Sequence, residues 1–216
     1  MTAARRKRGR LIVVEGIDGA GKSTLVRALG AALRRRGWSV AVRSEPADPT
    51  LSALAQSSSV RDAWTGAVYF TLDRFLARTA LVRDLAACDL VLSDRSFYST
   101  LAYQGSELSP ADRRRLERLQ RQASIVPDRV ILLDLEPGTA LRRLGVRAGR
   151  RGPLERRRVL GRVARAYRTM SARRGWTVVD ARLPTATAVR IVLPSLERLL
   201  LRGGGRASTR PARRRR

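Results

Sequence analysis

Short apolar runs alternate along the chain with longer segments whose apolar residues recur at helical spacing. The runs 11–14, 39–42, 90–92, 130–133 and 176–179 are strand candidates, and the first of them, Leu-Ile-Val-Val, is continuously apolar and rich in β-branched residues, as is typical of a strand covered on both faces. Helical patterns follow them: Leu25, Leu29 and Leu33 recur until Gly37 ends the first helix. Further helices are expected over 63–87, 109–125, 137–147, 154–173 and 184–201. This alternation predicts an α/β protein with a five-stranded parallel sheet and helices on both faces.

The charge is unevenly distributed along the 216 residues. The chain has 45 Lys and Arg against 18 Asp and Glu, a formal net charge of +27. Twelve of these positive charges lie in residues 1–10 and 202–216, which contain no acid and are expected to be disordered tails around one domain, 11–201. A charge of this size suggests nucleic acid as a partner. The tails contain no aromatic residues that could stack on bases, so we expect a nucleotide rather than a nucleic acid.

Composition excludes several classes of function. With no histidine, Ser-His-Asp, Cys-His and His-metal mechanisms are all ruled out. A single cysteine, Cys88, excludes a disulfide framework within the chain and a Cys-based zinc cluster. No apolar run is long enough to span a membrane, and the N-terminus lacks the apolar core of a secretory signal. We therefore expect a cytoplasmic protein.

The first strand is followed by a phosphate-binding motif. Residues 16–23 read Gly-Ile-Asp-Gly-Ala-Gly-Lys-Ser, which fits G-x-x-x-x-G-K-[ST] between a strand and a helix. Glycines let successive N–H groups point at one anion, and the helix that begins near Lys22 adds its positive end. Lys22 can reach the β- and γ-phosphates of ATP, and Ser23 can hold Mg²⁺. The expected ATP-binding residues are Gly16, Ile17, Asp18, Gly19, Ala20, Gly21, Lys22, Ser23 and Thr24.

A second candidate group lies at the end of the third strand. Asp94 and Arg95 directly follow the 90–92 run, and ligands of open parallel sheets bind at the carboxyl ends of the strands. Asp94 can orient Mg²⁺-bound water beside the phosphate loop, and Arg95 can hold a second phosphate through two hydrogen bonds. With the phosphate loop, this pair predicts a nucleotide triphosphatase or a kinase.

Taken in order, four segments resemble the thymidylate kinase family: Glu15–Thr24, Asp94-Arg95, the block Ser99-Thr100-Leu101-Ala102-Tyr103-Gln104-Gly105, and 127–134, which reads Pro-Asp-Arg-Val-Ile-Leu-Leu-Asp. The block at 99–105 is the more specific, because the phosphate-loop motif is common to many proteins. The resemblance implies a three-layer P-loop kinase fold, transfer of a phosphoryl group from ATP to dTMP for dTTP synthesis, and a homodimer.

The resemblance also assigns roles to individual positions. It implies that Arg95 holds the acceptor phosphate and that Asp18 contacts the acceptor nucleotide. Phe70 would stack on thymine, and Arg74 would hydrogen-bond the edge of the base. Ser99 or Thr100 would read the base, and Tyr103 would crowd the 2′ position of the sugar. Glu45 is the remaining residue expected to bind the acceptor.

A mobile lid is expected at about 147–156, by the same resemblance. Family members take a catalytic arginine either from the phosphate loop or from the lid, and the loop position here is Gly19. The lid must therefore supply it, and Arg150 is preferred over Arg147. The acceptor is already an anion, since the second pKa of a phosphate monoester is about 6, so the reaction needs no general base.

Departures from the family pattern leave alternatives open. Residues 44–48 read Ser-Glu-Pro-Ala-Asp where Arg-Glu-Pro-Gly-Gly is common, and 96–98 read Ser-Phe-Tyr. A deoxynucleoside kinase is the nearest alternative, with Glu45 as the general base that a sugar hydroxyl requires. A non-catalytic P-loop protein associated with nucleic acid is more distant. A switch GTPase is excluded, because Asn-Lys-x-Asp does not occur in a chain whose only lysines are Lys7 and Lys22.

Overall fold

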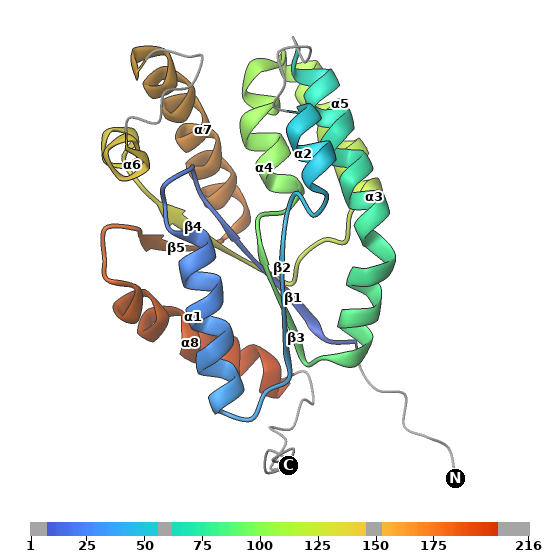
Figure 1. Ribbon diagram of the computed structural model, residues 1–216, viewed down its shortest axis with the longest axis vertical. Helices are drawn as coiled ribbons and strands as arrows, with labels where there is room; N and C mark the ends of the chain where they lie inside the picture. Colours follow the sequence, from blue (N-terminus) through green and yellow to red (C-terminus); the bar gives the residue numbers. More distant parts are fainter. Residues whose placement is uncertain (1–7, 56–61, 146–152, 203–216) are drawn as a thin grey trace.

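The computed structural model describes residues 8–55, 62–145 and 153–202. Five parallel strands form one sheet in the order β2-β3-β1-β4-β5 (Figure 1). The strands are β1 (Arg10–Glu15), β2 (Val40–Ser44), β3 (Leu90–Asp94), β4 (Arg129–Asp134) and β5 (Thr177–Asp180). The predicted α/β class and the five-stranded parallel sheet are therefore confirmed.

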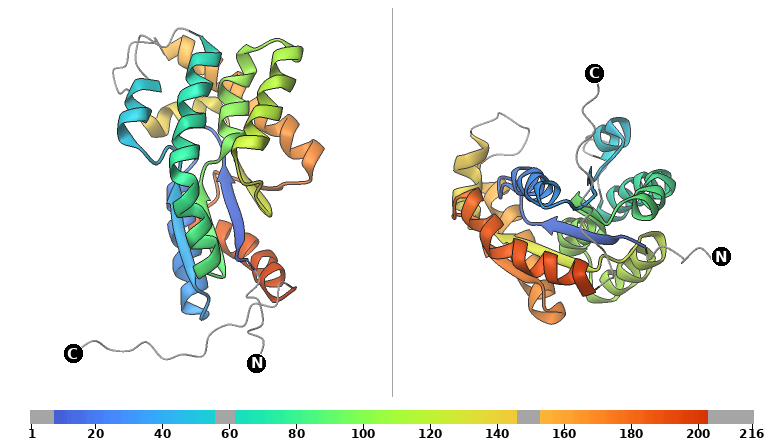
Figure 2. Two further views of the ribbon diagram at one scale, coloured as in Figure 1. Left: turned by 90° about the vertical axis from the view of Figure 1, so that its right-hand side faces the viewer. Right: turned by 90° about the horizontal axis from the view of Figure 1, so that it is seen from below.

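Helices connect the strands and cover both faces of the sheet (Figures 1 and 2). The helix expected over 63–87 has those bounds, and the two short helices at Pro49–Ala55 and Phe97–Tyr103 were not expected. The helical elements are α1 (Lys22–Arg35), α2 (Pro49–Ala55), α3 (Ala63–Ala87), α4 (Phe97–Tyr103), the 3-10 turn η1 (Gly105–Glu107), α5 (Pro110–Ala123), α6 (Pro137–Leu144), α7 (Pro153–Arg174) and α8 (Thr185–Arg202).

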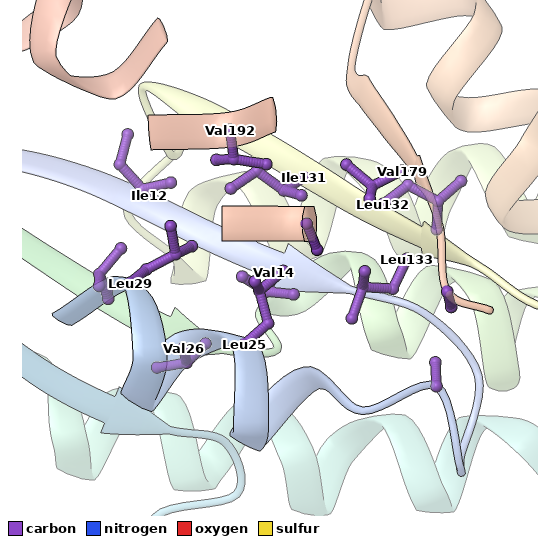
Figure 3. Close-up of a cluster of buried hydrophobic side chains, with 14 of the residues drawn as sticks. Ile12, Val14, Leu25, Val26, Leu29, Ile131, Leu132, Leu133, Val179 and Val192 are labelled. Carbon is purple, nitrogen blue, oxygen red and sulfur yellow. The ribbon is translucent and has the colours of Figure 1, made fainter. Parts of the chain in front are cut away.

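Alternate residues of β1 pack into two separate clusters of buried side chains. Ile12 and Val14 meet Leu29 of α1 and Val192 of α8 in one cluster (Figure 3). Leu11 and Val13 belong to the other, with residues of α3, α4 and α5: Ala67, Leu85, Phe97, Leu101 and Leu116. Both faces of β1 are therefore buried, which explains why its sequence is continuously apolar.

The elements begin and end at recognisable signals. Asp62 caps α3 by accepting a hydrogen bond from the Thr65 N–H at 2.9 Å, and Ser109 caps α5, which begins with Pro110. Gly37, expected to end the first helix, follows α1 with φ of 83°. In the part of the chain that the structure describes, no helix has the length and apolarity needed to cross a membrane.

Both expected tails overlap the ordered elements by one residue. β1 begins at Arg10, whose guanidinium donates to Asp128 at 2.8 Å, and α8 ends at Arg202. Asp128 also accepts from the Leu11 N–H at 2.8 Å, so it fixes the start of β1. Residues 1–7 and 203–216 lie outside the described residues, and the tail prediction stays a prediction there.

The apolar residues of α3 lie mostly on its outer face. Val68, Leu72, Phe75 and Leu76 are 56%, 44%, 53% and 64% exposed, although their spacing is that of an amphipathic helix. The inner face of α3 buries Ala67 and Leu85 in the apolar cluster, and between them it buries the polar residues Thr71, Asp73 and Arg74. This polar part of the inner face forms the wall of a polar site, and the outer stripe is surface.

Candidate active site

The phosphate loop connects β1 to α1 and depends on glycine at three positions. Gly16, Gly19 and Gly21 have φ of 149°, 81° and 90°, which L side chains rarely adopt. A Cβ on Gly16 would lie 2.6 Å from the Leu133 carbonyl oxygen, and one on Gly19 would lie 2.9 Å from that of Ala140. At Gly16 and Gly19 the loop therefore packs against β4 and α6 with no space for a side chain, whereas at Gly21 only the positive φ favours glycine. The loop leads directly into the N-terminus of α1.

Lys22 is buried within this loop. Its ammonium donates to the Ile17 carbonyl oxygen at 3.0 Å, so the side chain folds back over the loop. Burial and, to a smaller extent, the charge of Arg95 lower the pKa of Lys22 from 10.5 to about 8, against the opposing effect of Asp18, Asp94 and Glu15. The loop thus holds a cation that lacks full compensation, as a polyphosphate site requires.

Ser23 and Asp94 meet at the end of β3. The Ser23 hydroxyl donates to one carboxylate oxygen of Asp94, and the other oxygen, Oδ1, is buried with no partner among the described residues. Hydroxyl and carboxylate oxygens are ligands that suit Mg²⁺, which retains water and takes its other ligands from phosphates. Within residues 8–55, 62–145 and 153–202 no cluster of three acids forms a metal cage. The two residues expected to hold Mg²⁺ therefore fit that ion.

Beside the loop lies a cavity of about 340 Å³ between α3, α4 and the loops after β1 and β2. All eight residues expected to bind the acceptor line it, and they come from four separate parts of the chain. The lining consists of Asp18, Glu45, Pro46, Phe70, Asp73, Arg74, Arg95, Ser96, Ser99, Thr100, Tyr103 and Gln104. The structure thus brings the predicted set together, and their individual roles belong to the proposal below.

Arg95 lies in the cavity wall nearest to the phosphate loop. Its φ of 76° makes it the one residue other than glycine with a positive φ among the described residues, a conformation that is typical of functional sites. The guanidinium donates to Asp18 and, at 2.9 Å, to Ser99, and its Cζ lies 5.3 Å from the centre of the Tyr103 ring. Arg95 is therefore held on three sides and aimed at the junction of cavity and loop.

Ser99 and Thr100 are neighbours in the chain but face different groups. Ser99 Oγ donates to Glu15 at 2.7 Å and accepts from Arg95, which places it at the phosphate-loop end of the cavity. Thr100 Oγ1 accepts from Arg74 at 2.8 Å, which places it at the α3 end. Of the two residues expected to read a base, Thr100 is therefore the one beside Arg74.

Glu15 forms a buried cluster that the sequence reading did not assign to the site. Its carboxylate is fully buried and accepts from Ser96 at 2.7 Å, Ser99 at 2.7 Å and Tyr167 at 2.9 Å. Burial raises the pKa of Glu15, against the opposing effect of the Ser96 hydrogen bond and of Arg95. A charged residue at the end of the otherwise apolar 11–14 run is the signal that could have identified it.

Two adjacent residues of α3 hold the loop that follows β2. Asp73, 1% exposed, accepts from the Ala47 N–H at 3.0 Å and from the Asp48 N–H at 2.7 Å. Arg74 donates to the Glu45 carboxylate at 2.7 Å. The departure at Ala47-Asp48 from the family pattern is therefore accommodated by backbone hydrogen bonds, and Glu45 is already engaged by an arginine.

The expected lid arginines, Arg147 and Arg150, lie outside the described residues. Near the base of this segment, Arg143 of α6 donates to the Ala181 carbonyl at 2.9 Å and to that of Gly19 at 3.4 Å. Arg143 thus ties α6 to the phosphate loop and to the segment after β5.

The parallel sheet carries a glycine loop between β1 and α1, and a polar cavity lined by Arg95 lies beside that loop. Together these features define a P-loop nucleotide kinase. A family model described as thymidylate kinase matches residues 14–191. The chain belongs to the thymidylate kinase family.

Curated relatives agree with this assignment over most of the chain. A probable thymidylate kinase of Metallosphaera sedula is 32% identical over 92% of this chain and 97% of its own length. A probable thymidylate kinase of Archaeoglobus fulgidus is 34% identical over 81% and 88%. A thymidylate kinase of Xanthomonas euvesicatoria is 40% identical over 68% of this chain and 66% of its own length.

Proposed function

We propose that the protein transfers the γ-phosphoryl group of ATP to dTMP, which yields ADP and dTDP and supplies dTTP synthesis. The observation that carries the proposal is the joining of two anion sites, since Asp18 belongs to the phosphate loop and also lines the acceptor cavity. The names of the relatives and the family match support the same reaction.

On the donor side, residues 16–24 bind the phosphates of ATP through backbone N–H groups and the positive end of α1. Lys22 leaves the Ile17 carbonyl for the β- and γ-phosphates, where its charge is compensated. Ser23 and Asp94 would hold Mg²⁺, which when bound neutralises charge on the phosphate oxygens.

On the acceptor side, Arg95 binds the 5′-phosphate of dTMP, with Asp18 beside it. Phe70 and Arg74 lie one turn apart on α3 and line the same cavity, so a thymine ring can stack on Phe70 while Arg74 donates to its edge. Thr100 lies beside Arg74, and Tyr103 closes the cavity toward the phosphate loop by accepting from the Asp18 N–H at 3.2 Å.

Catalysis then consists of alignment and charge neutralisation. The acceptor oxygen carries negative charge at neutral pH, because the second pKa of a phosphate monoester is about 6. Lys22 and Arg95, on either side of the transferred group, stabilise the charge that develops on it. Arg150 remains the proposed lid arginine that completes this set.

The deoxynucleoside kinase alternative assigns Glu45 the work of a general base. Glu45 accepts from Arg74 Nε at 2.7 Å, and its side chain is 24% exposed. A carboxylate held by an arginine at the α3 end of the cavity positions that arginine and is poorly placed to take a proton. The curated relatives described above are named thymidylate kinases, so we do not retain the deoxynucleoside kinase alternative.

A coupled ADP-release assay with Mg-ATP tests the proposal. The acceptors are dTMP, dUMP, dCMP, dAMP, dGMP and the corresponding nucleosides, and we expect the highest kcat/KM with dTMP. Glu45→Gln should keep most of the turnover with dTMP, and Glu197→Gln on α8 serves as the matched control. An enzyme that is active on thymidine and inert with every monophosphate would refute the proposal.

A homodimer and a cytoplasmic location are further parts of the proposal. The exposed stripe Val68, Leu72, Phe75 and Leu76, continued by Val82 at 48% exposure, runs along the outer face of α3. Contiguous exposed apolar surface of this kind marks an interaction site. We assign it to a second copy of the chain, as the family resemblance implies.

A further inference from the structure

The guanidinium of Arg74 is surrounded by acceptors from four parts of the chain. Nε donates to Glu45 at 2.7 Å, and Nη2 donates to Thr100 Oγ1 at 2.8 Å and to the Ser96 carbonyl at 3.3 Å. Nη1 donates to the side-chain oxygen of Gln120 at 2.6 Å. An arginine has five N–H groups, so among the residues that the structure describes these bonds leave one N–H, on Nη1, available to a ligand in the cavity that Arg74 lines.

Gln120 fixes that nitrogen from α5, a helix that does not line the acceptor cavity. Its amide oxygen accepts from Arg74, and its amide nitrogen donates to Thr71 Oγ1 at 2.8 Å. Thr71 and Arg74 are three residues apart on the same face of α3, so a single amide spans both. Thr71 in turn donates to the Ala67 carbonyl at 2.7 Å, which fixes its hydroxyl as an acceptor for Gln120.

The position of Gln120 is set by packing. It is 0% exposed, and Leu116, one turn earlier on α5, is also 0% exposed within the cluster that joins α3, α4 and α5. A buried amide with both ends hydrogen-bonded has one orientation. Since the Gln120 amide is neutral, the negative charge that balances Arg74 comes from Glu45. The hydrogen bond from Gln120 instead fixes the orientation of the guanidinium.

We propose that Gln120 is a positioning residue that directs the remaining Nη1 N–H of Arg74 at the acceptor base, and that it thereby sets the preference for a pyrimidine with a 4-keto group over one with a 4-amino group. This inference rests on the proposed function. Arg74 can only donate hydrogen bonds, so it pairs with the O4 acceptor of thymine and opposes the amino group of cytosine. The opposition is strong only if the guanidinium cannot turn away, and the Gln120–Thr71 chain prevents that rotation.

The direct test replaces the amide without changing its length. Gln120→Met removes both hydrogen bonds and keeps most of the volume, whereas Gln120→Glu keeps an acceptor for Arg74. We expect Gln120→Met to lower the ratio of kcat/KM for dTMP over dCMP about tenfold, which is the effect of losing one well-directed hydrogen bond to a charged group. The loss should appear in KM for dTMP with kcat retained, because the base lies away from the transferred phosphoryl group.

The controls separate positioning from general damage. Gln120→Glu should restore most of the discrimination, and Gln122→Met, at an exposed position of the same helix, should leave it unchanged. Should Gln120→Met fail to fold, Thr71→Val loosens the same amide from α3 and should lower the ratio in the same direction by a smaller factor. Thermal melting of each variant checks that comparisons are made on folded protein.

Binding of dTMP and dCMP is measured by calorimetry beside turnover, so that the two proposals can fail separately. A wild-type protein that binds dTMP in preference to dCMP but transfers no phosphoryl group would overturn the proposed function, and the ratio of dissociation constants would then decide the role of Gln120. A folded Gln120→Met or Thr71→Val protein with the discrimination and KM of the wild type would overturn the inference. So would a wild-type protein that does not discriminate between the two nucleotides.

Discussion

The depressed pKa of Lys22 makes ATP affinity depend on pH in a defined range. Burial and the charge of Arg95 lower the pKa of Lys22 from 10.5 to about 8 in the ligand-free protein. Phosphate oxygens within hydrogen-bond distance favour the ammonium form and raise that pKa when ATP is bound. Binding therefore takes up a proton wherever the free protein has released it, and affinity falls as the pH rises above 8.

The magnitude follows from the fraction of free protein in which Lys22 is protonated. Apparent affinity falls by a factor of one plus the ratio of neutral to charged lysine, which is about tenfold at pH 9 and about thirtyfold at pH 9.5 relative to neutral pH. Proton uptake on binding is about half a proton at pH 8 and approaches one at pH 9.

The assay is calorimetric titration with Mg-ATP between pH 7.5 and 9.5, in buffers that differ in ionisation enthalpy. Lys22→Arg is the matched control, because its guanidinium stays charged throughout this range and the slope should vanish. A wild-type affinity that is constant from pH 7.5 to 9.5 would refute the reasoning. An equal decline in Lys22→Arg would do so as well, since it would assign the proton to another group.

The same shift has a consequence for folding. A lowered lysine pKa means that the unfolded chain binds more protons between pH 8 and 10.5, so this residue's contribution makes stability rise with pH across that window. Below pH 8 the folded protein holds the ammonium at a full cost of about 3 kcal/mol. Lys22→Met should therefore abolish turnover and yet leave the ligand-free protein at neutral pH at least as stable as the wild type.

Three further changes test the loop, the buried cluster and the outer stripe. Gly16→Ala places a Cβ 2.6 Å from the Leu133 carbonyl oxygen at φ of 149°, so we expect the free energy of unfolding to fall by about 2 kcal/mol and ATP binding to be lost. Gly161→Ala is the control and should have no such effect. Equal melting temperatures for the two variants would contradict the geometry. Glu15→Gln leaves the Ser96, Ser99 and Tyr167 hydroxyls without a charged acceptor, so we expect the free energy of unfolding to fall by about 1.5–3 kcal/mol. The KM for dTMP should rise, because Ser99 also holds Arg95. An unchanged KM would show that Glu15 does not act on the acceptor site. Leu76→Asp should convert a dimer to a monomer in sedimentation velocity with little change in melting temperature, and Leu201→Asp is the control at an equally exposed leucine. A wild-type protein that is a monomer, or a Leu76→Asp variant that remains a dimer, would refute the assignment of the α3 stripe.

The parts of the fold that could be predicted were those with a contiguous signal. The apolar run of β1, the glycine motif and Leu25, Leu29 and Leu33 of α1 follow one another in the chain, and local geometry alone makes them a phosphate loop. Helix α4 was missed because seven residues, Phe97–Tyr103, are too few to show a helical period. Its start is nevertheless marked by Ser96, which caps it by accepting from the Tyr98 N–H at 3.3 Å.

Contacts between distant residues set the limit of sequence reading for the site. The family resemblance predicted the residues that line one cavity. It did not predict that Ser99 hydrogen-bonds Glu15 while Thr100 hydrogen-bonds Arg74. Gln120 had no signal at all, because it lies 46 residues from Arg74 on a helix that otherwise looks like charged surface. On α3 the apolar spacing predicted the helix but not which residues it buries, since Thr71, Asp73 and Arg74 of the inner face are held by partners that spacing cannot reveal.

The two ends of the acceptor cavity use arginine in opposite ways. Four of the five N–H groups of Arg74 donate to neutral and acidic acceptors in a buried site, so its direction is fixed before a ligand arrives and it is suited to discrimination. Arg95 sits at a positive φ next to a half-exposed Asp18 that an incoming phosphate can displace, so its charge remains available for binding. Lys22, with its pKa near 8, adds a second incompletely compensated cation across the loop. In the proposed mechanism the charge to be neutralised moves between Lys22 and Arg95, while the base stays at Arg74. Changes at the phosphate end should therefore alter kcat as well as KM, whereas changes at the base end should alter KM and the choice of nucleotide with kcat retained.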